Sequence, residues 1–192
     1  MACSASTQTI AVGTELQNHT ASISLWYAPL SLLSYFLGGE EPAVPLKSWA
    51  LTTSSRDVRS NPSPKATYQE VHSDDITDLS FHPSNASLLL SGSTDGLVNV
   101  YDTQIPDEDD LTLQTFNHNA SIHHAGFLTD SEIVALSNDE QFALYDVAEE
   151  RPGGDATQDF GDMREVLGCQ YVADVTPKLD GSGAVIGAGA QE

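Results

Sequence analysis

The sequence has few cysteines, few basic residues and no long apolar run. Its two cysteines, Cys3 and Cys169, lie far apart and match no zinc or redox spacing, so we expect no disulfide scaffold and a reducing compartment. The most apolar run, Tyr27–Gly39, falls short of the ~20 residues that span a bilayer. No basic start followed by an apolar stretch marks a secretory signal at Met1. We therefore expect a cytoplasmic or nuclear protein that does not enter membranes.

Basic residues are the scarcest class, because Lys plus Arg number 7 against 28 Asp plus Glu. The imbalance is greatest in residues 71–192, whose only bases are Arg151, Arg164 and Lys178. A surface this acidic repels phosphate backbones and anionic lipids. We therefore expect binding to neither nucleic acid nor membrane. The charge fits either simple solubility or a protein partner with a basic surface.

What the sequence does contain is a repeat with a period of about 45 residues. Residues 71–102 align with residues 117–146: each begins near a histidine, carries an aspartate in a turn and ends on Tyr-Asp. Short strand-like runs broken by Gly, Asn, Asp and Pro at roughly 8–12-residue spacing indicate an all-β fold. Asp95-Gly96 lies between two such runs and predicts a tight β-hairpin.

A repeat of this period, with an early His and an aromatic-Asp pair at its end, resembles the WD40 repeat, which builds four-stranded blades of a β-propeller. The sequence is also similar to the WD repeat-containing protein 89 group, most specifically at residues 71–102. The resemblance implies an all-β, partial WD40 propeller with about four complete or partial blades of about seven. We expect a fragment of a longer protein; the alternative is that another chain supplies the remaining blades.

The ends of the repeat pattern predict incomplete blades. Residues 9–26 supply two strands of the first blade, whose first strand is expected before Met1. Residues 66–71 are expected to form its outer strand. In the last blade, Cys169–Val175 is the expected first strand and Ala184–Gly187 the start of the second.

An unrelated segment interrupts the first repeat. Trp26 should be followed by Asp, but residues 27–56 intervene and match nothing else in the chain. Deleting them joins Trp26 to Asp57 and restores the expected Trp-Asp dipeptide. We therefore divide the chain into a partial first blade (1–26), an insertion (27–56) and the remaining blades (57–192, the last incomplete). We interpret the insertion as a translated retained intron, with a true loop insertion as the alternative.

The resemblance assigns structural roles to particular polar side chains. WD40 blades contain a hydrogen-bonded tetrad of His, Ser or Thr, Asp and Trp, and here His72, Ser91, Asp95 and Tyr101 occupy its positions. The next blade offers His118, Asp139 and Tyr145, but Ala135 replaces the Ser, so we expect this tetrad to be open. The WD-type dipeptides are Trp26 with Asp57, Tyr101 with Asp102, and Tyr145 with Asp146.

Two acidic segments are candidates for partner binding, because loops displayed on a rigid scaffold commonly carry function. They are Pro106–Asp110 and Glu149–Asp162, and both are expected between strands. Their alternative interpretation is that they are solvated connections. The candidate contact residues are Asp107, Glu108, Asp109, Asp110, Glu149 and Glu150.

No metal, cofactor or catalytic residue is expected. His118, His123, His124 and Asp130 invite a metal site, but His123 and His124 are adjacent on a strand and point to opposite faces. We therefore expect a scaffold that mediates protein–protein interactions without catalysis. Two alternatives stay open: a hydrolase with a His/Asp site in the central channel of the propeller, and a truncated gene product without function.

Overall fold

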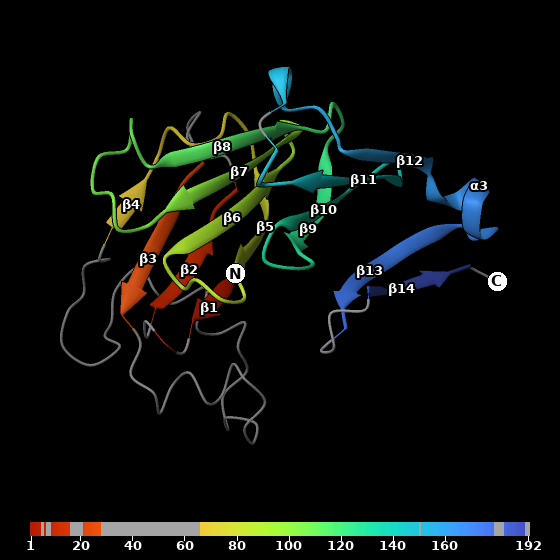
Figure 1. The fold of residues 1–192 in the computed structure, drawn as a ribbon, viewed down its shortest axis with the longest axis horizontal. Coiled ribbons are helices and arrows are strands. Elements are labelled where there is room, and N and C mark those ends of the chain that lie inside the picture. Colours follow the sequence, from red (N-terminus) through yellow and green to blue (C-terminus); the bar gives the residue numbers. More distant parts are fainter. Residues whose placement is uncertain are drawn as a thin grey trace.

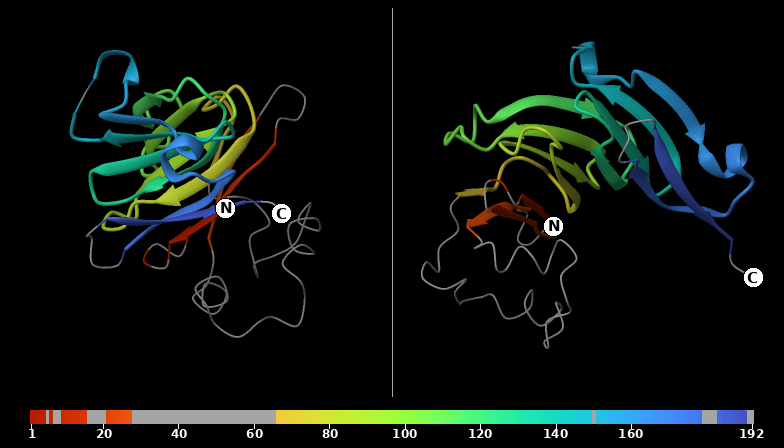
Figure 2. Two further views of the ribbon diagram at one scale, coloured as in Figure 1. Left: turned by 90° about the vertical axis from the view of Figure 1, so that its right-hand side faces the viewer. Right: turned by 60° about the horizontal axis from the view of Figure 1, so that its bottom comes forward.

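The computed structural model describes residues 1–4, 6, 9–15, 21–27, 66–149, 151–178 and 183–190. Its regular structure is almost entirely β, in sheets that follow one another in chain order along an arc (Figures 1 and 2). Blade 1 comprises β1 (Ala2–Ser4), β2 (Thr9–Gly13), β3 (Ile23–Tyr27) and β4 (Ala66–Tyr68). Blade 2 comprises β5 (Ile76–Phe81), β6 (Leu88–Ser93), β7 (Leu97–Asp102) and β8 (Thr112–Asn117).

The C-terminal half continues the same pattern. Blade 3 comprises β9 (Ile122–Phe127), β10 (Glu132–Ser137), β11 (Gln141–Asp146) and β12 (Gln158–Asp162). Blade 4 comprises β13 (Tyr171–Pro177) and β14 (Ala184–Gly189). A 3-10 turn, η1 (Pro152–Gly154), precedes β12, and a short helix, α3 (Met163–Leu167), follows it. Within every sheet the pairing is antiparallel and follows chain order, which confirms the all-β expectation of complete and partial blades.

The middle strands of blades 2 and 3 are largely buried on both faces, because a neighbouring blade packs on either side. β6 is buried at five successive positions, whereas the outer strand β12 is largely exposed. The β6–β7 hairpin turns at Gly96, whose φ of 86° suits a residue without a Cβ. The equivalent turn of blade 3 places Glu140 at φ 63°, a conformation that costs a residue with a side chain some free energy.

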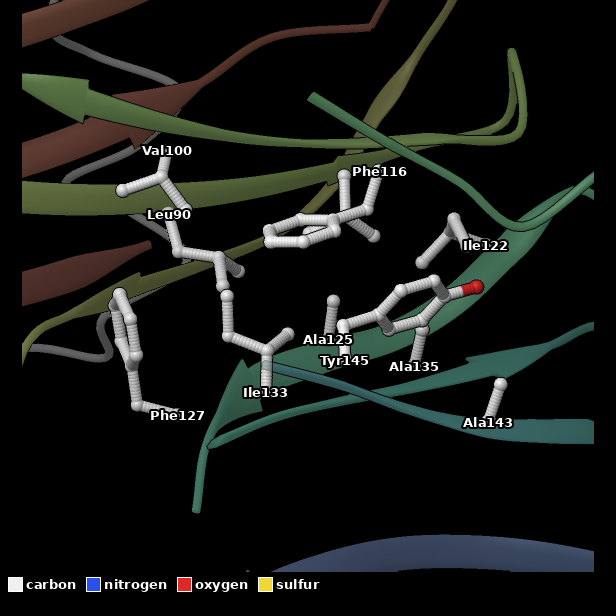
Figure 3. Close-up of a cluster of buried hydrophobic side chains, with 11 residues drawn as sticks. Leu90, Val100, Phe116, Ile122, Ala125, Phe127, Ile133, Ala135, Ala143 and Tyr145 are labelled. Carbon is white, nitrogen blue, oxygen red and sulfur yellow. The ribbon is translucent and has the colours of Figure 1, made fainter. Parts of the chain in front are cut away.

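Hydrophobic clusters fill the spaces between consecutive blades. Between blades 2 and 3, Leu90 faces Ile133, and Phe116 lies against Tyr145 with ring centroids 5.1 Å apart (Figure 3). Other clusters join blade 1 to blade 2 and blade 3 to blade 4. Burying one such aliphatic side chain is worth about 1.5–3 kcal/mol. The arc is therefore held together by apolar packing between blades as well as by hydrogen bonds within them.

Two strand expectations need correction. Ala2–Ser4 pairs with β2 as the first strand of blade 1, so the expectation that this strand precedes Met1 is wrong. Gln158–Asp162 forms β12, so the second acidic segment is not wholly a connection between strands. The expected outer strand of blade 1 is present as β4, which pairs with β3 across the insertion. Residues 28–65, most of the insertion included, lie outside the described residues.

Candidate functional site

Four polar side chains of blade 2 form one continuous chain of hydrogen bonds. His72, between β4 and β5, has its Nδ1 2.9 Å from Asp95 Oδ2 and its Nε2 2.7 Å from Ser91 Oγ. Ser91 lies on β6, and its Oγ is 2.8 Å from the Tyr101 hydroxyl on β7. The structure thus brings together the four residues that the resemblance assigns to a tetrad. They tie the segment that enters the blade to its second and third strands.

The electrostatics of this chain favour an ionised Asp95 and a neutral Tyr101. Burial by itself raises the pKa of Asp95, but the hydrogen bond and charge of His72, together with the amides of Ser73 and Leu97, bring it down to about 2. Burial raises the pKa of Tyr101, so its phenol keeps the proton. The Tyr101 hydroxyl can therefore donate to Ser91 Oγ, and His72 donates its Nδ1–H to Asp95.

The order Ser–His–Asp is also that of a hydrolase triad, so the accessibility of the hydroxyl decides what it can do. Ser91 is 0% exposed, and Tyr101 lies against its Oγ. A substrate carbonyl cannot reach a hydroxyl buried in this way. The arrangement therefore serves to stabilise the blade, since buried polar groups are tolerated when they are hydrogen-bonded to one another.

Asn99 is a buried polar residue that sequence reasoning missed. It lies on β7, and its Nδ2 donates to the main-chain carbonyl of Val71, 2.8 Å away. This bond fixes the residue just before His72 and so helps to position the imidazole. A polar residue between two valines was the available signal, but a sequence does not show which main-chain group it will bind.

The equivalent residues of blade 3 are connected differently. His118 Nδ1 lies 2.9 Å from the Tyr145 hydroxyl, with no serine between them, and its Nε2 lies 3.1 Å from the carbonyl of Gln141. Burial lowers the pKa of His118, which favours a neutral ring that donates to Gln141 and accepts from Tyr145. Asp139 is exposed and does not take part in this set of bonds; its carbonyl accepts from Arg164 instead.

Two of the WD-type dipeptides end β7 and β11, and Trp26 is the next-to-last residue of β3. Trp26 lies opposite Ile10 on β2, and its partner Asp57 lies outside the described residues. Asp102 accepts the amide of Gln104, 3.0 Å away, and Asp146 accepts that of Ala148, 2.8 Å away. These two aspartates therefore shape the first turn of the acidic loops that follow them.

The first acidic loop, residues 103–111, reaches the outer edge of blade 1. Glu108 Oε1 accepts the backbone N–H groups of Gln69 and Glu70, the latter at 2.6 Å, just after β4. Glu108 is thus an anchor that holds the loop. Asp107, Asp109 and Asp110 are exposed, which leaves their carboxylates at the surface.

The second acidic loop, residues 147–157, contacts the outer strand of the preceding blade, blade 2. The Gln114 side chain donates to the carbonyl of Glu149, and Gly154 lies so close to β8 that a Cβ there would stand 2.6 Å from the carbonyl oxygen of Thr115. Glu149 is exposed and pairs with Arg151 at 2.8 Å, while Glu150 lies outside the described residues. We call loops 103–111 and 147–157 together the acidic rim, since each connects the third and fourth strands of its blade.

The residues that suggested a metal site are separated by the fold. His118 binds Tyr145, His123 is exposed, His124 is half-buried beside Asp78, and Asp130 binds Ser84 of blade 2. Within the described ranges, no group of His, Cys, Asp and Glu side chains is arranged to hold a metal ion. No helix in the part of the chain that the structure describes is long and apolar enough to cross a membrane.

A hollow between blades 3 and 4 is lined by His123, Asn138, Glu140, Tyr171, Val172 and Ala173. The Glu140 carboxylate in this hollow has a structural role, because its Oε2 accepts the backbone N–H of Val172 at 3.0 Å. The strained turn at Glu140 therefore links the third blade to the inner strand of the fourth.

A family model described as "WD domain, G-beta repeat" matches residues 63–102. The matched stretch includes β4 of blade 1 and β5, β6 and β7 of blade 2, so one repeat spans two blades. This overlap explains why each blade needs its neighbour to be complete.

Several relatives carry the same repeat in their names. A WD repeat-containing protein of Saccharomyces cerevisiae is 40% identical over 129 residues, which cover 66% of this chain and 33% of the yeast protein. One of Schizosaccharomyces pombe is 38% identical over 134 residues, or 65% of this chain and 40% of that protein. The WD repeat-containing protein 89 homolog of Dictyostelium discoideum is 31% identical over 107 residues, or 54% and 29%. The matched part is thus at most two fifths of each relative's length.

Proposed function

We propose that this chain, which carries a WD40 repeat and whose relatives are WD repeat-containing proteins, is a scaffold that binds other proteins and catalyses no reaction. The observation that carries the proposal is the burial of its polar network. The Ser-His-Asp chain of blade 2 is closed off inside the sheet, whereas the charged side chains of the acidic rim are at the surface. Catalysis would need the Ser-His-Asp chain to be accessible to a substrate, whereas binding needs only the exposed side chains of the acidic rim.

The acidic rim is the surface that we assign to the partner. Its exposed carboxylates include Asp107, Asp109, Asp110 and Glu149, and among the residues that the structure describes only Glu149 of these four pairs with a base, Arg151. Both loops are fixed to the preceding blade by hydrogen bonds or close packing, so their shape is set before a partner arrives. Such a surface complements a protein with a basic surface, since opposite potentials steer association and select among partners. Two free cysteines fit the proposed cytoplasmic or nuclear location.

Substituting the rim tests the proposal. The variant Asp109→Asn/Asp110→Asn removes two exposed rim charges, and the control Asp159→Asn/Glu165→Gln removes two exposed charges near α3. The control should still bind the proteins that the wild-type chain captures from cell extract, and the rim variant should bind them more weakly. We expect Kd to rise roughly two- to fivefold for each charge removed, as for exposed ion pairs.

Salt provides the second arm of the experiment. Because exposed charges are screened within about 10 Å at 0.1 M salt, capture through the rim should decline steadily as sodium chloride is raised. Capture that is indifferent to salt and equal for both variants would reject the rim as the binding surface. Turnover of a panel of ester and amide substrates, abolished by Ser91→Ala, would reject the scaffold assignment itself.

A further inference from the structure

Three residues hold the same position on the inner strands of consecutive blades. Asp78 on β5, His124 on β9 and Asp174 on β13 each precede a buried apolar residue. Each also follows a break in pairing register, where one residue of the inner strand has no partner: Thr77, His123 and Ala173. A bulge of this kind re-aims the side chain that follows it. The three residues are therefore placed in a row by a feature that the blades share.

The row is connected through the imidazole in its centre. His124 Nδ1 lies 2.5 Å from Asp78 Oδ2 of blade 2. On the other side, His124 Nε2 lies 3.2 Å from the carbonyl of Val175 and 3.6 Å from Asp174 Oδ1 of blade 4. One side chain of blade 3 thus touches both neighbouring blades.

The partners of His124 determine its protonation. A carboxylate and a main-chain carbonyl only accept hydrogen bonds, so both ring nitrogens must carry a proton to satisfy them. That state is the imidazolium ion. The hydrogen bond to Asp78 raises the pKa of His124, burial opposes it, and the charges of Asp78 and Asp174 add to the increase.

No other charge faces the ring among the described elements packed against it. β10 places Leu136 opposite His124, and β6, with the sequence LLLSGS, contains no titratable residue. On β9 itself, His123 is exposed. Asp78 is also held in place by the amides of Leu79 and Ala125, and Asp174 by that of Val175 and the hydroxyl of Thr176.

We propose that the row Asp78–His124–Asp174 is a pH-dependent clamp that tightens the attachment of blade 4 to blades 2 and 3 while His124 is protonated and loosens it when His124 is neutral. On deprotonation the remaining proton stays on Nδ1, which faces the closer carboxylate, Asp78. Nε2 then has no proton to offer, and its contacts with Val175 and Asp174 are lost.

The sign of the pH effect follows from the direction of the shift. A histidine whose pKa is raised on folding adds stability that is fully present below its ordinary pKa of about 6.5. This stability is lost as the pH rises through the raised value. The clamp is therefore closed below about pH 6.5 and opens as the pH rises through the raised pKa of His124.

The first test is a titration of the wild-type 192-residue chain by NMR, which needs no variant. The ring Cε1–H signal of His124 should titrate above the ordinary range of an exposed imidazole. Assignment comes from its disappearance in His124→Gln. Titration of this signal at or below the ordinary value overturns the proposal.

The second test locates the effect by hydrogen exchange, with protection factors corrected for the intrinsic pH dependence of exchange. Amides of β13 should lose roughly two- to fivefold protection between the closed and open pH ranges, the scale of a partly exposed ion pair. Both Asp174→Asn and His124→Gln should make this loss much smaller, whereas His123→Gln, on the same strand, should keep it. A pH-dependent loss of β13 protection that persists in His124→Gln overturns the clamp. Loss of rim-dependent binding in that variant would count against the proposed function and not against the clamp.

Discussion

At the scale of single residues, two blades satisfy the same buried polar positions in different ways. Blade 2 uses a serine to join its histidine to its tyrosine, while in blade 3 alanine replaces the serine and His118 contacts Tyr145 itself. The Tyr101 hydroxyl thus contacts a serine in blade 2, whereas the Tyr145 hydroxyl contacts the imidazole in blade 3. Sequence alone indicated an open set in blade 3; in the structure His118 bonds Tyr145 directly, and Asp139 lies outside the set.

Removing the serine hydroxyl from blade 2 should be costly. Ser91→Ala leaves His72 and the buried Tyr101 hydroxyl without their shared partner, and an unsatisfied buried polar group costs about 1–3 kcal/mol. We expect a loss of this size in the free energy of unfolding measured with urea. Ala135→Ser in blade 3 is the matched change in the opposite direction, and it should not stabilise the protein, because His118 is already bonded. Stabilisation by Ala135→Ser would contradict this explanation.

Acid should weaken the protein partly through Asp95. Its folded-state pKa of about 2 is below the ordinary value, so its contribution to stability is present above about pH 4 and is lost as the pH falls towards 2. The check is the difference in unfolding free energy between wild type and Asp95→Asn, measured from pH 7 to pH 2. The difference should shrink across this window, and a constant difference would rule out the ionised Asp95–His72 pair as its source.

His118 should respond to mild acid in the opposite direction to His124. Burial lowers the pKa of His118, so its neutral form stabilises the fold above about pH 6.5, and this contribution is lost as the pH falls below that value. The destabilisation on mild acidification should be smaller in His118→Gln than in the wild type, as followed by urea unfolding. An unchanged acid response in His118→Gln would contradict the assignment.

At the scale of the strand, close approach between blades decides which glycines are required. A Cβ at Gly92 on β6 would lie 2.8 Å from Ile122 Cγ2 and 3.0 Å from Ala125 Cβ on β9. A Cβ at Gly126 would meet only Ser80, at 3.8 Å and more, which is ordinary contact. The separation of blades 2 and 3 is therefore set by the absence of a side chain at one position.

The two glycines give a matched pair of substitutions. Gly92→Ala should cost about 1–3 kcal/mol by overpacking, measured as a fall in unfolding free energy. Gly126→Ala should change stability little. Equal effects of the two alanines would show that the blades do not approach as described.

Sequence reasoning succeeded for elements with a strong local signal. The hairpin at Asp95-Gly96, the histidine before each full repeat and the first strand of blade 4 all follow from turn residues and the repeat. It failed for Ala2–Ser4 and Gln158–Asp162, which are strands because a neighbouring strand offers them partners, not because their composition favours β structure. The Asp78–His124–Asp174 row was missed for a related reason. Side chains about 50 residues apart meet only when blades stack.

At the scale of the whole molecule, each blade depends on the next. One WD40 repeat contributes strands to two blades, apolar clusters fill the gaps between blades, and the acidic loop of each full blade from the second onward lies over the outer strand of the blade before it. The result is a fixed framework that presents carboxylates along one series of equivalent loops. This combination of a buried polar interior and a charged rim is what a binding scaffold requires.

The most direct measurement is zero-length carbodiimide cross-linking of the chain to the proteins that it captures, followed by mass spectrometry. The chain is rich in carboxylates and has few amines, so most couplings that form will join its acidic residues to lysines of a partner. Cross-links are expected at Asp107, Asp109 and Asp110, and they should be lost in Asp109→Asn/Asp110→Asn. Cross-links confined to Asp159, Glu165 and the surface around α3 would contradict the assignment of the rim as the binding surface.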